Sequence, residues 1–133
     1  MAMRAAEPDP TTGSRTRGRV VVVEDHPDVA ALLAHELADA GYAVTAAGAA
    51  VGAAALVRRV RPRAIVLDLG LPYRSGVSLL EELKADPRTA TVPVVVVSAY
   101  TEQLSARQAG LATAVIPKPF ELDSLLAAVR HAA

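Results

Sequence analysis

From residue 19 onward the chain alternates short apolar runs with longer amphipathic segments. Each short run has the length and the β-branched composition of a strand, and each longer segment repeats its apolar residues at helical spacing. The predicted strands cover residues 20–23, 42–47, 64–68, 92–98 and 114–116. The predicted helices run from Pro27 to a stop at Gly41, through the Ala-rich stretch that ends near Arg61 and Pro62, and over residues 76–85, 101–110 and 121–132.

These strands are continuously apolar, as in "VVVV" at residues 20–23, and lack the alternation of a strand with one face in water. A parallel sheet covered by helices buries both faces of such strands. The pattern therefore predicts an α/β doubly wound fold, with a five-stranded parallel sheet and helices on both faces, in one domain over residues 19–133. Periodicity does not set the strand order. Residues 1–18 mix Pro, Gly, Ser, Thr and Arg without apolar periodicity and are predicted to form a flexible N-terminal extension.

Composition narrows the function classes. Hydrophobic residues make up 52% of the chain and aromatic residues only 3%, so the core must be built from Val, Leu, Ile and Ala. Fourteen Lys and Arg balance fourteen Asp and Glu, which gives no electrostatic reason for direct nucleic-acid binding but leaves a local patch open. No apolar run reaches the roughly 20 residues that span a bilayer, and there is no cysteine. We expect a cytoplasmic protein without membrane insertion.

Polar residues follow four of the five predicted strands. Glu24 and Asp25 end the first strand, Asp68 ends the third, Ser98 ends the fourth, and the fifth runs into Lys118. In an open parallel sheet, ligands bind outside the carboxyl ends of the strands, so these side chains are predicted to converge. Three carboxylates in a small space need a cation or raised pKa values. Mg²⁺ suits this set because it takes one or two carboxylates, keeps waters and binds phosphate oxygens.

The segments "VVVVED", "VLDLGLPYRSG", "VVVVSA" and "IPKPF" together resemble the receiver domain of two-component response regulators, in the CheY-like superfamily, over nearly all of residues 19–133. The resemblance implies that Asp68 is the phosphoacceptor and takes its phosphoryl group from a histidine kinase or a histidine phosphotransfer protein. It also implies that Asp25 ligates Mg²⁺ directly, Glu24 mainly through water, and Gly70 through its backbone carbonyl. Asp68 itself completes the metal site.

By the same resemblance, Ser98 and Lys118 hold the oxygens of the transferred phosphoryl group. The peptide bond from Lys118 to Pro119 is expected to be cis, a conformation that is accessible at low cost only before proline. The chain departs from the family pattern in carrying Val115 three residues before the lysine, where Tyr or Phe is usual. Tyr100 is a candidate to substitute for that ring, and one extra residue lies between Gly110 and the lysine.

The function predicted from these residues is a single-domain response regulator. It is a Mg²⁺-dependent phosphoacceptor with self-catalysed phosphorylation and dephosphorylation, rather than an enzyme, and it switches binding to a downstream protein target, with a homodimer left open. The alternatives are a degenerate or constitutive interaction module, a receiver fragment of a hybrid kinase, and a haloacid-dehalogenase-type phosphatase, which would need an Asp in place of Gly70.

Simpler interpretations exist for each residue. Glu24, Asp25 or Ser98 could serve only as helix caps, and Lys118 could be a solvated charge. The three histidines, His26, His35 and His131, share no metal-ligand spacing and are predicted to be exposed surface residues.

Overall fold

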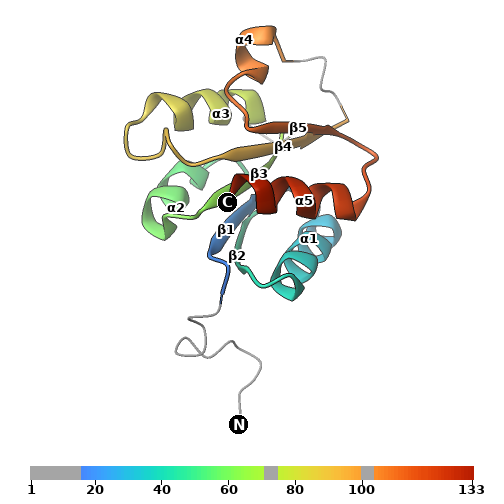
Figure 1. The fold of residues 1–133 in the computed structure, drawn as a ribbon. Helices are drawn as coiled ribbons and strands as arrows, with labels where there is room; N and C mark the ends of the chain where they lie inside the picture. Colours follow the sequence, from blue (N-terminus) through green and yellow to red (C-terminus); the bar gives the residue numbers. More distant parts are fainter. Residues whose placement is uncertain (1–15, 71–74, 100–103) are drawn as a thin grey trace.

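The computed structural model describes residues 16–70, 75–99 and 104–133, which form a five-stranded parallel sheet between two layers of helices (Figure 1). The strand order is β2-β1-β3-β4-β5, and every neighbouring pair is parallel. The predicted fold class is therefore confirmed, and the order is added to it. The strands are β1 (Arg19–Val23), β2 (Ala43–Ala47), β3 (Ala64–Asp68), β4 (Val94–Ser98) and β5 (Ala114–Pro117).

Helices cover both faces of the sheet, because alternate residues of each central strand face opposite sides. Val21 and Val23 pack with the helices of one face, whereas Val20 and Val22 pack with those of the other. The first face carries α2 (Ala53–Val60) and α3 (Gly76–Ala85), and the segments flanking α4 (Ala106–Ala109) also pack there; the second face carries α1 (Pro27–Asp39) and α5 (Leu122–Ala132). Both faces are thus apolar, as the continuous runs predicted.

Two helices end at the residues that the sequence indicates. After α1, Gly41 has a φ of 108°, and its amide donates to the carbonyl of Ala38 at 3.0 Å. A left-handed residue here is most easily a glycine, since no Cβ opposes the turn. The second helix ends at Arg61, which has a φ of 53°, and Pro62 follows and prevents continuation.

The fourth helix is much shorter than predicted. The prediction was 101–110, but the described part of this segment is helical only over Ala106–Ala109, and residues 101–103 lie outside the described residues. Ser105 is extended and accepts a hydrogen bond from the Gln108 amide at 3.1 Å, while the Gln108 side chain accepts from the Ser105 amide at 2.9 Å. This reciprocal capping box fixes the helix start at Ser105, and the spacing Ser-x-x-Gln was its signal in the sequence.

Little of the predicted N-terminal extension can be compared with the structure, because residues 1–15 lie outside the described residues. The amide of Arg17 donates to the carbonyl of Gly41 at 2.8 Å, which ties the last part of this segment to the domain. Flexibility of the extension stays a prediction. Over residues 16–70, 75–99 and 104–133, no helix is long and apolar enough to cross a membrane.

Candidate functional site

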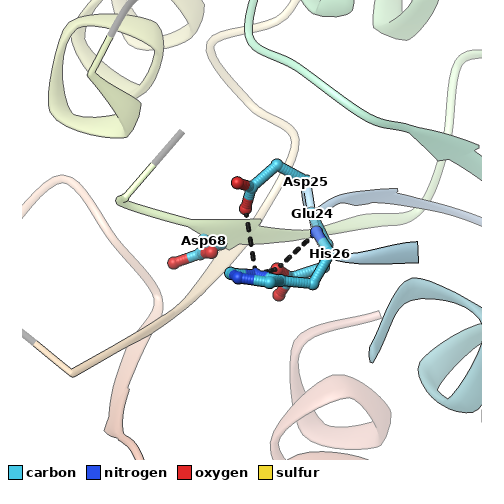
Figure 2. Close-up of side chains that lie close together, drawn as sticks. All are labelled: Glu24, Asp25, His26 and Asp68. Atoms are coloured by element: carbon cyan, nitrogen blue, oxygen red, sulfur yellow. Dashed lines mark hydrogen bonds and ion pairs between the residues drawn. The ribbon is translucent and has the colours of Figure 1, made fainter. Parts of the chain in front are cut away.

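Three carboxylates and one imidazole gather where the carboxyl ends of the strands meet, which we call the carboxyl edge of the sheet. Glu24 and Asp25 follow β1, and Asp68 ends β3 (Figure 2). One ligand atom from each of these acids and from His26 can be chosen so that all four lie within 4.8 Å of one another. Glu24 is 2% exposed and Asp68 is 5% exposed. Anionic groups this close and this buried repel one another, so the edge attracts positive charge.

Lys118 brings an ammonium group to two of these carboxylates. Its Nζ lies 3.4 Å from Glu24 Oε1 and 3.6 Å from Asp68 Oδ2. The lysine follows β5 directly, and its bond to Pro119 is cis, as the sequence predicted. One cation among several carboxylates offsets only part of their charge.

Ser98 closes the site on the β4 side. It is fully buried at the end of β4 and pairs with Pro117, while Asp68 pairs with Val97. Ser98 therefore lies one residue further along the sheet edge than Asp68. Its carbonyl accepts a hydrogen bond from the Lys118 amide at 2.9 Å, which joins the two predicted phosphoryl-binding residues through the backbone.

The backbone after β3 also contributes to the site. The amide of Gly70 donates to Asp68 Oδ1 at 3.1 Å, which orients the carboxylate. Gly70 is therefore part of the site through its amide, and ligation through its carbonyl stays a prediction. The amide of Gly76, at the start of α3, donates to the carbonyl of Leu69 at 2.8 Å and holds the helix against the strand end.

Two residues bear on the aromatic side chain that the family pattern usually carries, and only one of them is described. Val115 is half-buried and packs against the side chains on the α2 and α3 face. Tyr100 lies outside the described residues, so its substitution for the missing ring stays a prediction.

His26 is the site residue that sequence reasoning missed. Its side chain is 68% exposed, as predicted for a surface histidine, but Nδ1 lies 3.1 Å from Glu24 Oε2 and 3.3 Å from Asp25 Oδ1. The hydrogen bond to Glu24, followed by the charge of Asp25, raises the pKa of His26. Its position directly after the acid pair was the available signal. His35 and His131 are exposed, as predicted.

The donor set fits a divalent cation. Asp25 Oδ1 is buried and makes no hydrogen bond within the part of the chain that the structure describes, although it lies at ion-pair distance from His26. A buried carboxylate oxygen without a hydrogen bond is costly unless a cation or water satisfies it. Carboxylate oxygens are the ligands that hard divalent ions prefer. Glu24, Asp25 and Asp68 can therefore hold such an ion together.

The fold and the site together define a class of protein: a doubly wound α/β domain with a buried aspartate, an acid pair and a lysine at its carboxyl edge. The family model for the response regulator receiver domain matches residues 20–130. The chain belongs to the response regulator receiver domain family of two-component signalling. This membership favours the receiver interpretation over the phosphatase alternative.

Individual relatives agree with the family. The chain is 32% identical over 115 residues to the transcriptional regulator RpaA of Synechocystis sp., covering 84% of this chain and 47% of RpaA. It is 36% identical over 116 residues to the transcriptional regulatory protein KdpE of Mycobacterium tuberculosis, covering 85% of this chain and 50% of KdpE. The chain thus spans about half the length of these curated relatives. A sensor protein from Polaromonas sp. has a similar structure, with a TM-score of 0.80, 33% identity, and coverage of 87% of this chain and 95% of that one.

Proposed function

We propose that this domain is a phosphorylation-dependent switch in which Asp68 accepts a phosphoryl group from the phosphohistidine of a histidine kinase or phosphotransfer protein. The observation that carries the proposal is the position of Asp68, which is 5% exposed and has its Oδ2 3.6 Å from the Lys118 ammonium. A carboxylate oxygen forms the new bond to phosphorus while the bond from phosphorus to the donor imidazole breaks. The donor imidazole leaves as the neutral base because its other ring nitrogen takes up a proton from water.

The difficulty of this reaction is electrostatic, because the carboxylate and the phosphoryl group are both anionic. The Lys118 ammonium screens their approach and stabilises charge on the phosphoryl oxygens. Mg²⁺, held by Glu24, Asp25, Asp68 and the carbonyl of Gly70, would supply further positive charge and bind a phosphoryl oxygen. The hydrogen bond from the Gly70 amide to Asp68 Oδ1 keeps the nucleophile in one orientation.

Ser98 couples the modified aspartate to the rest of the molecule. It lies at the end of β4, next to the strand that presents Asp68, and its hydroxyl can donate to a phosphoryl oxygen. The added charge draws Ser98 and the chain that follows β4 toward Asp68, which shifts the domain between two surface states. Because Val115 carries no ring or hydroxyl, this step does not use an aromatic side chain at that position.

A downstream protein target then distinguishes the two surface states, and hydrolysis of the aspartyl phosphate within the same site resets the switch. A cytoplasmic location is part of this proposal. A constitutive module that binds its target without phosphorylation is the alternative, but it would have no need of an ammonium group beside a buried Asp68.

The test is incubation with acetyl phosphate and Mg²⁺, followed by intact-mass measurement. The wild-type protein is expected to gain one phosphoryl group, and Asp68→Asn none. Asp86→Asn is the matched control, because Asp86 lies before β4, at the opposite edge of the sheet, and this variant should be modified like the wild type. No modification of the wild type would support the constitutive module. Steady release of inorganic phosphate at enzymatic rates would support a phosphatase.

A further inference from the structure

His26 belongs to the acid cluster but has no role in phosphoryl transfer as proposed above. Its side chain is 68% exposed and could extend into water. Instead, its Nδ1 faces the carboxylates of Glu24 and Asp25, and the ring lies beside Asp68 (Figure 2). A ring nitrogen directed at the oxygens that would ligate a cation is itself in a position to ligate it.

The distances around Nδ1 are those of neighbouring donors on one ion. Donors about 2.1 Å from an octahedral ion lie about 3.0 Å apart when adjacent and about 4.2 Å apart when opposite. Nδ1 lies 3.1 Å from Glu24 Oε2 and 3.3 Å from Asp25 Oδ1, close to the adjacent spacing. The four candidate ligand atoms all lie within 4.8 Å of one another, which is compact enough for them to surround one ion.

The backbone holds His26 in this place. Its amide donates to Glu24 Oε2 at 3.3 Å, the same oxygen that Nδ1 contacts. Pro27 follows and begins α1, which restricts the preceding residue to the extended conformation that His26 adopts, with φ of −84° and ψ of 115°. The imidazole is therefore positioned before any ion binds, which reduces the entropy lost on binding.

We propose that His26 is a nitrogen ligand to the divalent ion of this site. It binds through Nδ1, in the neutral tautomer whose proton is on Nε2. The site therefore prefers first-row transition ions to Mg²⁺ more strongly than an all-carboxylate site would. The inference rests on the proposed function in using the same ion site. Imidazole suits Zn²⁺ and Ni²⁺, whereas Mg²⁺ prefers oxygen donors.

Calorimetric titration of the metal-free full chain with Ni²⁺ and Mg²⁺ tests this selectivity, since the chain has no tryptophan for a fluorescence signal. His26→Gln removes the ring and keeps a polar side chain. We expect Ni²⁺ affinity to fall by at least about 10–100-fold in this variant, because even the loss of a residue that only orients a metal ligand has an effect of this size, and Mg²⁺ affinity to fall by a clearly smaller factor. The matched control is the double variant His35→Gln/His131→Gln, which keeps His26 alone among the three histidines and should bind Ni²⁺ like the wild type.

A second measurement reports ligation directly. In the ¹⁵N spectrum of the double variant, Zn²⁺ should shift the Nδ1 resonance of His26 and leave the Nε2 proton in place. Equal losses of Ni²⁺ and Mg²⁺ affinity in His26→Gln, or an Nδ1 resonance that Zn²⁺ does not move, would overturn the inference and leave His26 as a counter-ion only. Failure of the proposed function is distinguishable: there the wild type would not be phosphorylated with Mg²⁺, whatever the Ni²⁺ result.

Discussion

The carboxyl and amino ends of the strands form two edges of the sheet that carry opposite charges, and the charged side chains have different surroundings at each. At the carboxyl edge, Glu24 and Asp68 are buried, and Asp25, with a half-buried side chain, crowds beside them. At the amino edge, exposed arginines stand at the starts of the strands, with Arg19 beginning β1, Arg63 preceding β3, and Arg88 in the segment before β4. The balance of fourteen basic and fourteen acidic residues therefore conceals a separation of charge.

The arginines at the amino edge are satisfied locally. Arg19 Nε donates to the carbonyl of Val60 at 2.8 Å, and Arg88 binds both oxygens of Asp86. At the other edge, by contrast, Asp25 Oδ1 is buried and makes no hydrogen bond to any described residue. One edge is arranged for stability, whereas the other keeps a buried carboxylate oxygen without a hydrogen bond, as expected where a site must bind an ion.

Gly76→Ala is expected to have the largest effect, because the backbone at the carboxyl edge has no spare room. A Cβ at this position would lie 2.5 Å from the Asp68 carbonyl oxygen and 2.5 Å from Leu69 Cα. Backbone atoms cannot move aside as a flexible side chain can, so we expect a loss of about 1–3 kcal/mol in the free energy of unfolding, or more. Urea denaturation measures it.

Gly48→Ala is the control for Gly76→Ala. Gly48 follows β2 at the same edge, and a Cβ there meets no atom within 4 Å. This variant should be neutral, or more stable by about 0.4–1 kcal/mol, because alanine has fewer unfolded conformations to lose. Equal destabilisation of the two variants would show that the close approach at Gly76 is not the cause.

Asp25→Asn should stabilise the protein when divalent ions are removed with EDTA. The amide removes one charge from a crowded anionic site and can donate a hydrogen bond, so we expect a gain of about 1 kcal/mol in the free energy of unfolding. Saturating Mg²⁺ should then stabilise the wild type by about 2.7 kcal/mol at 100 times its dissociation constant, and the variant much less. A variant less stable than the wild type in EDTA would contradict the view of this edge as strained by repulsion.

A structural feature of this protein can be predicted from the sequence when residues close together in the chain determine it. The strands and their terminal acids follow from apolar runs such as Val20–Val23, because such a run is buried whatever its neighbours are. The order β2-β1-β3-β4-β5 needs contacts between distant segments and was not predictable. The start of the fourth helix is also determined by nearby residues, because Ser105 and Gln108 form its capping box. The prediction placed the start at residue 101 because the residues before Ser105 also have helical composition.

The site was predicted to the same extent. The convergence of Glu24, Asp25 and Asp68 follows from parallel strands ending at one edge. The contacts of His26 cannot be predicted from the spacing of the histidines along the sequence, because they depend on how the backbone turns between β1 and Pro27. A histidine next to an acid pair was visible in the sequence, but the direction of its ring was not.

Asp86→Asn should give the smallest effect, and the opposite sign to Asp25→Asn, because Asp86 is the acid among arginines. Hydrogen bonds from Arg88 lower the pKa of Asp86 below its ordinary value of 3.8. A carboxyl group with a lowered pKa in the folded state stabilises that state above its unfolded pKa, and this contribution is lost as pH falls through the folded pKa. Wild type should therefore be slightly more stable than Asp86→Asn at neutral pH, and the two should converge as the solution is acidified below about pH 4. Urea denaturation across this pH range measures the difference. Arg88→Gln should show a smaller difference that converges in the same way, since it removes the Arg88 pair and leaves the ion pair between Arg58 and Asp86. A difference that stays constant into acid would show that the charge of Asp86 is not its cause.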